Sequence, residues 1–194
     1  MKRGLFVALL LCTVAGFAQD AELPFDERGK FIYYEVVVQK DVPAAMLMER
    51  ATKFFSASKE LKLKTVPQDT LWMARGKMVI NKTAFVLSRP SGEVGYHLYL
   101  DFKDGKYRFW LTDFSFISYQ RDRYGNFVPE TTVGIPLENK PGKLNAGEWT
   151  AYSKATAREA RLFAERFKKG MSEHAINPPT AKAVPSVDTK NQKW

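Results

Sequence analysis

Few residues of this chain have the type and spacing that catalysis needs. Its two histidines, His97 and His174, are far apart, and neither has the Glu-x-x-His or His-x-x-x-His spacing of a metal site. The sequence has no G-x-S-x-G nucleophile motif, no G-x-x-x-x-G-K-S/T phosphate loop and no G-x-G-x-x-G dinucleotide turn. Its one cysteine, Cys12, falls in an N-terminal apolar run. We therefore expect no metal site, no cofactor and no thiol chemistry.

Carboxylates are the remaining candidates for chemistry, above all Glu35, Asp101 and Asp113. Two carboxylates within about 5–10 Å of each other in a closed pocket could act on a glycosidic bond. The pattern puts Asp113 opposite Tyr96 on the core face of a sheet, where burial would make it a general acid or base. We favour the simpler alternative, in which Asp113 lies at the sheet margin and accepts hydrogen bonds.

The element that positions these residues is a predicted β-hairpin between residues 96 and 117. Asp104-Gly105 separates two apolar runs and predicts a two-residue turn with positive φ at both positions. Because side chains alternate along a strand, one face pairs Phe102 with Tyr107, Leu100 with Phe109, and Leu98 with Leu111. The other face pairs Asp101 with Arg108, Tyr99 with Trp110, and His97 with Thr112. A slip of one residue would mix the two faces, so turn and pairing support each other.

The second face of this sheet is the predicted binding surface. If helices cover one side only, the other side gathers aromatic and basic residues, which can stack on sugars, lipids, peptides or bases. The candidate ligand-binding residues are Tyr33, Arg75, Lys77, His97, Tyr99, Arg108 and Trp110. The alternative is that the C-terminal helix or the loops between residues 118 and 147 cover this face, which would make Tyr99 and Trp110 core residues.

The other elements follow from residue patterns. Residues 31–40 predict a strand with Ile32, Tyr34, Val36 and Val38 toward the core. Residues 44–57 predict a helix with Pro43 in its first turn and Asp41 near the cap. Residues 70–80 predict a strand with Gly76 at a bulge or close contact, and residues 83–87 a short strand that ends in a turn at 89–92.

The C-terminal part is predicted as loops followed by a long helix. Glycine and proline mark residues 118–147 as loops with at most one short strand, at 131–137. Residues 146–173 form an amphipathic helix that begins after Asn145. It could lie on a membrane surface, but its aromatic stripe favours packing on the sheet. The fold class is α+β: a curved antiparallel sheet with helices on one face, in the order β-α-β-β-β-loops-α.

The termini indicate export and a single domain. Lys2 and Arg3 precede an apolar run at residues 5–14, which predicts a signal peptide at 1–18 with cleavage after Ala18. That run is too short to span a membrane. A single domain at 19–176 follows, with a core at about 23–140, and residues 177–194 are predicted to be disordered.

The charge of the chain favours anionic partners. The net charge is +9, and loss of Lys2 and Arg3 would leave +7. In a cell envelope the partners would be acidic glycans or lipid head groups, and nucleic acid is less expected in that compartment. The alternative is that the charge only keeps the protein soluble.

Two segments carry a resemblance to a known family. They are L-P-F-D-E-R-G-K-F-I-Y-Y-E-V-V, from Leu23, and D-F-K-D-G-K-Y-R-F-W-L-T-D-F, from Asp101. Together with the intervening helix they resemble the DUF4468 family, exported Bacteroidetes proteins described as having a TATA-binding-protein-like (TBP-like) fold. The resemblance covers residues 23–117, and its most specific part is residues 103–108. It implies a fold and an export route but no catalytic residue or ligand, and the fold name does not imply DNA binding.

We therefore expect an exported, non-enzymatic envelope protein that binds a ligand or partner through the aromatic and basic sheet face. Two alternatives remain open. One is an envelope hydrolase or transferase that uses the carboxylates named above. The other is a nucleic-acid-binding protein, whose affinity would fall steeply with salt.

Overall fold

The computed structural model describes residues 22–64, 71–84, 87–139, 142 and 145–172. The predicted signal peptide and the tail at 177–194 lie outside the described residues. The elements are β1 (Ile32–Val38), α1 (Ala44–Ala57), β2 (Leu61–Leu63), β3 (Leu71–Ala84), β4 (Leu87–Lys103), β5 (Lys106–Arg121), β6 (Phe127–Pro129), β7 (Ile135–Pro136) and α2 (Ala146–Ser172).

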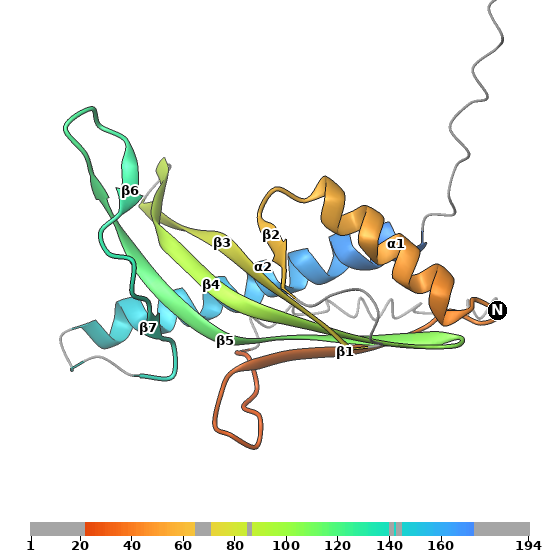
Figure 1. Ribbon diagram of the computed structural model, residues 1–194. Helices are drawn as coiled ribbons and strands as arrows, with labels where there is room; N and C mark the ends of the chain where they lie inside the picture. The colour runs from red at the N-terminus through yellow and green to blue at the C-terminus, as the bar shows by residue number, and fades with distance from the viewer. Residues whose placement is uncertain (1–21, 65–70, 85–86, 140–141, 143–144, 173–194) are drawn as a thin grey trace, which may run out of the picture.

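These strands form one curved antiparallel sheet, in the order β1-β5-β4-β3-β2. The short strands β6 and β7 pair with the far end of β5. Both α1 and α2 pack on the same side of the long strands, and α2 runs along most of the sheet (Figure 1). The predicted fold class is thus confirmed.

The central hairpin has the predicted register, but its turn differs. All six predicted cross-strand pairs are present. Only Gly105 has a positive φ, of 74°, whereas both turn residues were expected to have one. The reason is that the turn docks on α1: Asp104 Oδ1 accepts a hydrogen bond from Ala44 N at 2.7 Å, and Gly105 N donates to Val42 O at 2.9 Å. The prediction that Asp41 caps α1 is therefore wrong. The side chain of Asp104, in the hairpin turn, accepts the hydrogen bond from the first turn of the helix instead.

The chain reverses between β3 and β4 later than predicted. β3 continues to Ala84 and β4 starts at Leu87, so the separate strand at 83–87 and the turn at 89–92 are both wrong. Pro90 lies within β4, and the pairing shifts there, from Asn81 opposite Pro90 to Ile80 opposite Gly92. A bulge of this kind admits a proline because the ladder is already interrupted.

The region at 118–147 also holds more strand than predicted. β5 extends to Arg121, and Asp122 then forms a turn, its Oδ1 accepting hydrogen bonds from Tyr124 N and Asn126 N at 2.8 Å each. β6 returns beside β5, which makes the expectation of at most one short strand wrong. β7 lies inside the predicted range of 131–137.

The core lies between the sheet and the two helices. Phe167 of α2 makes edge contacts with Phe54 of α1 and with Phe109 of β5, with ring centroids 5.1 Å apart in both cases. The predicted close contact at Gly76 is confirmed, because the ring of Tyr96 lies directly over it. None of the helices in the described part of the chain combines the length and hydropathy that a membrane crossing needs.

Candidate functional site

The open face is defined here as the side of the sheet opposite α1 and α2. The register of the long strands brings side chains on this face into rows. One row, called the aromatic row, consists of Met73, Tyr99, Trp110 and Tyr34, which lie opposite one another on β3, β4, β5 and β1. The rings of Tyr99 and Trp110 are stacked, with centroids 5.2 Å apart and planes 12° apart. Tyr34 adds a third ring, 6.4 Å from that of Trp110.

The predicted residues Tyr99, Trp110, Arg108, Arg75, His97 and Lys77 all lie on strand positions of the open face. The guanidinium of Arg108 lies 5.7 Å from the centroid of Trp110 and forms an ion pair with Asp101 at 2.8 Å. The neighbouring Tyr34 hydroxyl and the Asp101 carboxylate raise the pKa of Arg108. Arg108 is therefore a fixed cation at the edge of the aromatic row.

Tyr33 is the exception, because it points to the helix side. β1 pairs with β5 so that Ile32, Tyr34, Val36 and Val38 lie on the open face, and their predicted place in the core is wrong. Tyr33 instead lies 6.2 Å from Phe109 and donates a hydrogen bond to Glu35 Oε2. Burial first, and then that hydrogen bond, raises the pKa of Tyr33 to about 12.

Glu35 shares this helix side, and its partner explains why sequence reasoning misplaced β1. The ammonium of Lys168 on α2 donates to Glu35 Oε1 at 2.7 Å. Hydrogen bonds to Glu165 and to Glu35 raise the pKa of Lys168. Both faces of β1 carry large apolar side chains, so alternation alone does not decide which face is buried. The ion-pair partner of Glu35 comes from a helix more than a hundred residues later in the chain.

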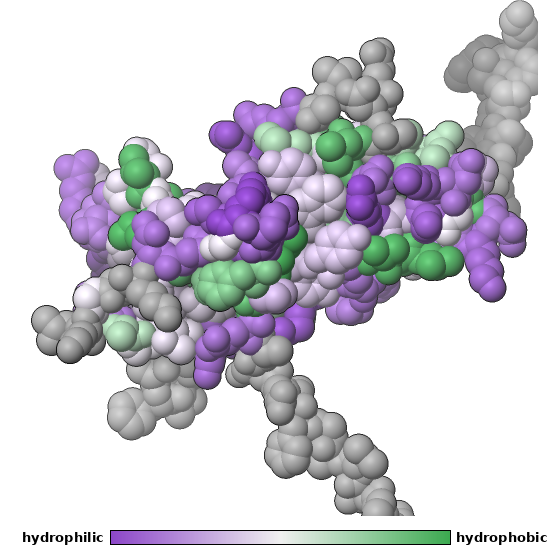
Figure 2. All heavy atoms as spheres, turned by 90° about the horizontal axis from the view of Figure 1, so that it is seen from below, coloured by the Kyte–Doolittle hydropathy of each residue, from purple (hydrophilic) through white to green (hydrophobic). Residues whose placement is uncertain are grey.

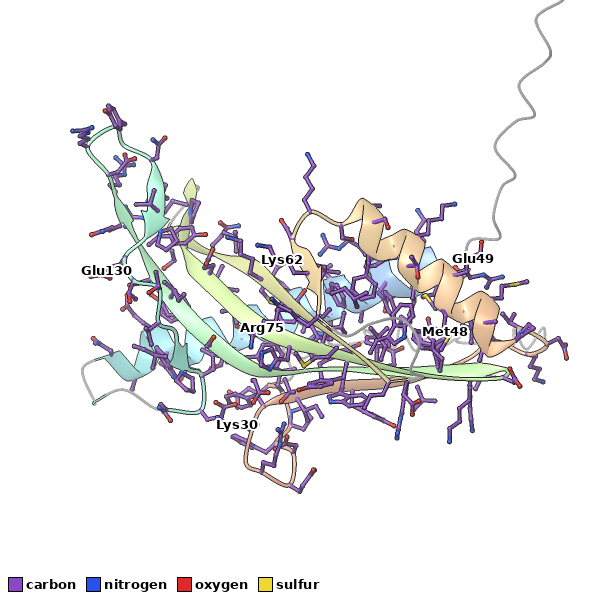
Figure 3. All side chains as sticks on the ribbon, viewed as in Figure 1. Lys30, Met48, Glu49, Lys62, Arg75 and Glu130 are labelled. Carbon is purple, nitrogen blue, oxygen red and sulfur yellow. The ribbon has the colours of Figure 1, made fainter. Side chains whose placement is uncertain are left out.

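A second row, called the basic row, lies beside the aromatic row. Lys62 on β2 lies opposite Arg75 on β3, and Arg75 lies opposite His97 on β4. Lys62 and Arg75 are both exposed and come from neighbouring strands (Figure 3). Within the described residues, neither has an ion-pair partner. Like charges directly opposite each other repel, so this pair favours the presence of an anion.

Lys77 lies farther along the same strand and is already occupied. Its ammonium forms an ion pair of 2.9 Å with Glu93, whose carboxylate also accepts a hydrogen bond from Tyr119. Lys77 sits opposite Gly95, one row beyond His97 and two beyond Tyr99. We therefore place it at the margin of the candidate site.

Asp113 does not lie on the core face. The pairing of β4 with β5 shifts between Gly95 and His97, and Asp113 adopts a left-handed backbone there, with a φ of 55°. This bulge turns the Asp113 side chain to the open face, where its Oδ2 lies 3.1 Å from His97 Nδ1. The prediction of Asp113 on the core face is wrong because strict alternation does not hold through a bulge.

Among the residues that the structure describes, the segment before β1 covers one end of the open face. Arg28, in the segment before β1, donates a hydrogen bond to the buried Thr112 hydroxyl at 3.3 Å. In Figure 1, α2 lies on the opposite side of the sheet, and β6 and β7 pair with β5 at residues 115–121, so the described parts of these segments do not cover the rows of Tyr99 and Trp110. Between this segment and the aromatic row lies a depression of about 560 Å³, lined by Asp26, Glu27, Arg28, Ile32, Tyr34, Tyr99, Arg108 and Trp110.

The surface on this side is mixed in character. Figure 2 shows the molecule from below, the side on which β1 and the preceding loop lie in Figure 1. Residues of intermediate hydropathy form a pale band across the middle, with both hydrophobic and hydrophilic groups around it. Among the residues that the structure describes, no group of three or more histidine, cysteine, aspartate or glutamate side chains could hold a metal ion. The stacked rings of Tyr99 and Trp110 and the cations Lys62 and Arg75 suit this face to stacking and charge pairing.

Comparisons with known proteins agree with this fold. A TBP-like protein from Parabacteroides distasonis ATCC 8503 superposes with a TM-score of 0.56 at 13% identity, over 78% of this chain and 99% of that chain. A DUF4468 family protein from Bacteroides ovatus ATCC 8483 superposes with a TM-score of 0.55 at 12% identity, over 80% of this chain and 94% of that chain. At these identities the likeness shows the fold alone. No curated protein matches the sequence.

The match to a family is narrower than the resemblance read from the sequence. The family model described as a domain of unknown function (DUF4468) with TBP-like fold matches residues 33–117, whereas the resemblance began at Leu23. The matched range runs from β1 to β5 and includes the aromatic row. This chain therefore has the TBP-like fold, and its residues 33–117 match the DUF4468 family that the sequence resembles.

Proposed function

We propose that this chain is an exported, non-enzymatic binding protein of the cell envelope that holds its ligand on the open face. The observation that carries the proposal is the stacked pair of Tyr99 and Trp110, extended by Tyr34, on the side of the sheet opposite the two described helices. Contiguous aromatic surface that a fold leaves outside its core is typical of a recognition site. The lysine, arginine and apolar run at the N-terminus supports export.

The ligand class that fits this surface best is an anionic glycan. The apolar face of a sugar ring can stack on the aromatic row, as planar groups do on such rings. Residues two positions apart along a strand are separated by about 7 Å, so the basic row lies within reach of an acid group on the same or the next sugar. Lys62 and Arg75 would bind that group, and their mutual repulsion would then be relieved.

The positions of the carboxylates support binding rather than catalysis. Glu35 lies on the helix side, away from Asp101 and Asp113. Asp101 is paired with Arg108, and Asp113 lies against His97. A carboxylate pair for glycoside chemistry needs two free groups facing one substrate in a closed pocket, and the open face offers a shallow surface.

The test uses an oligogalacturonate and, as its neutral control, the methyl ester of the same oligosaccharide. Calorimetric titration should show binding of the acid, and binding of the ester weaker by roughly tenfold or more, about 1.4 kcal/mol. The double variant Tyr99→Ala/Trp110→Ala should lose binding while it still melts cooperatively. Tyr124→Ala removes an aromatic side chain that is 74% exposed and outside the row, and should bind normally.

Each other outcome has a defined meaning. Loss of cooperative melting in the double variant would show that the pair belongs to the core, and the proposal would fail. Release of shorter saccharides during the titration would favour the hydrolase alternative. Binding to vesicles that contain phosphatidylglycerol, with no binding to the glycan, would assign the face to lipid head groups. Binding to a single-stranded oligonucleotide that falls steeply with salt would favour nucleic acid.

A further inference from the structure

The other side of the sheet carries a separate cavity of about 330 Å³. It lies where the C-terminal end of α1 and the middle of α2 meet β2, β3 and β4. Its apolar wall consists of Phe54, Leu61, Met78 and Phe163. The volume falls in the range of small-molecule sites, about 300–1,000 Å³. One molecule occupies about 30 Å³ in liquid water, so the cavity has the volume of about eleven water molecules. A molecule of about that many non-hydrogen atoms would fill it.

A hydroxyl without a partner faces this cavity. Tyr96 is only 5% exposed and lines the cavity, yet its hydroxyl makes no hydrogen bond to any residue that the structure describes. Gly76 makes the position of the ring possible, because a Cβ there would lie 2.4 Å from Tyr96 Cζ. Burial, and then the charge of Glu60, raise the pKa of Tyr96, while Arg166 lowers it, and the net direction is upward. The hydroxyl is therefore a neutral donor, and a ligand in the cavity can accept its hydrogen bond.

The charges around the cavity are uneven. Lys77 is held by Glu93 on the opposite face, and Glu159 lies 3.5 Å from Arg158. Within the described part of the chain this leaves the cations Lys59 and Arg166 against the single anion Glu60. One uncompensated positive charge at the polar end of an apolar cavity favours a ligand with one negative charge.

We propose that this cavity binds a small amphipathic carboxylate, with its head group on Arg166 and the Tyr96 hydroxyl and its apolar part against Phe54, Leu61, Met78 and Phe163. This site is on the helix side of the sheet and does not depend on the function proposed for the open face. A chain of about ten carbons fits the volume, because a methylene or methyl group occupies about as much space as a water molecule.

Three ligands of one length test the charge preference: decanoate, decanol and decylamine, each kept below its aggregation concentration. Calorimetry should show decanoate to bind most tightly, decanol roughly tenfold more weakly and decylamine weaker still, since a hydrogen bond to a charged group is stronger than one to a neutral group. Arg166→Gln should bring decanoate to the level of decanol. Tyr96→Phe keeps the ring and should weaken decanoate and decanol alike.

The matched control is the double variant Tyr99→Ala/Trp110→Ala, which should bind decanoate as the unchanged protein does. Absence of decanoate binding to the unchanged protein would overturn the proposal. Decanoate binding that is lost in a double variant that still melts cooperatively would also overturn it. The same holds for decanoate binding that neither Arg166→Gln nor Tyr96→Phe alters while both variants still fold. None of these outcomes depends on whether the open face binds a glycan.

Discussion

Replacing Lys62 with glutamate should stabilise the free protein and weaken its binding of anions. Lys62 lies directly opposite Arg75, and both side chains are exposed. A cross-strand pair of opposite charges contributes roughly 0.2–1 kcal/mol, and a pair of like charges is unfavourable by a similar amount. Reversing one sign would therefore add about 0.4–2 kcal/mol. Exposure and salt screening place the value in the lower half, about 0.4–1 kcal/mol, or roughly 1–4 °C in melting temperature.

The assay is thermal unfolding without ligand, at low and at high salt, followed by titration with the oligogalacturonate. The stability gain of Lys62→Glu should shrink as salt screens the pair, and its affinity for the anion should fall. Lys64→Glu makes the same change of charge, but Lys64 adjoins Met73 rather than a cation. We therefore expect its free energy of unfolding to change by no more than about 0.5 kcal/mol. A Lys62→Glu protein that is no more stable at low salt, or that binds the anion as before, would refute the reasoning.

Three further predictions concern the fold. Gly76→Ala should destabilise the protein by about 1–3 kcal/mol in urea unfolding, because the new Cβ would meet the ring of Tyr96. Gly95→Ala should change the stability little, because a Cβ there meets only Ser115, at 3.3 Å. Equal effects of the two substitutions would contradict this packing. Asp104→Ala should lower the free energy of unfolding by about 1 kcal/mol, because α1 loses the hydrogen bond that caps it. Asp104→Asn keeps an acceptor oxygen and should retain most of that stability. An Asp104→Ala protein of unchanged stability would show that the cap is not needed. Burial, and then a hydrogen bond to a glutamate, raises the pKa of Tyr33 and Tyr119 from 10.0 to about 12. Their contribution to stability should be complete below pH 10 and lost between pH 10 and 12. The measurement is the tyrosinate absorbance of the native protein against pH. The prediction would be contradicted if this absorbance rose at the same pH as that of the unfolded chain.

The parts of the fold that follow from local pattern could be predicted. Asp104-Gly105 and the strict alternation of its flanking residues determine which side chains of β4 and β5 share a face, and this holds from Lys103 and Lys106 out to His97 and Thr112. The apolar spacing of α2 likewise gave its position, because a long amphipathic helix needs one surface to cover.

Features that depend on distant contacts could not be predicted. The orientation of β1 follows from its pairing with β5 and its contacts with α2, among them the ion pair of Lys168 with Glu35. The face of Asp113 depends on a bulge that interrupts alternation. Lys62 was missed because a strand of three residues carries too little pattern, and its significance comes only from pairing with β3. The candidate site was therefore predicted in its central pair, while its outer members required the register of the whole sheet.

Within the candidate site, Tyr34 shows most clearly the difference between what local pattern predicts and what only strand pairing determines. Its neighbour Tyr33 has the same side-chain type, and each of them could have faced the core. Only the pairing of β1 with β5 assigns Tyr34 to the aromatic row, opposite Trp110. A sequence signal did exist, since Glu35 follows Tyr33 at the spacing of one face, but it indicated the wrong face because its ion-pair partner was unknown.

The most direct test of the open face is a nuclear magnetic resonance titration that follows the indole N–H signals of Trp72, Trp110 and Trp149 as the oligogalacturonate is added. Trp72 and Trp149 are buried on the helix side, whereas Trp110 lies in the aromatic row. We predict that the Trp110 signal shifts with added glycan while the other two stay in place. A shift confined to Trp72 or Trp149, or a Trp110 signal that does not move while the glycan binds, would contradict the account.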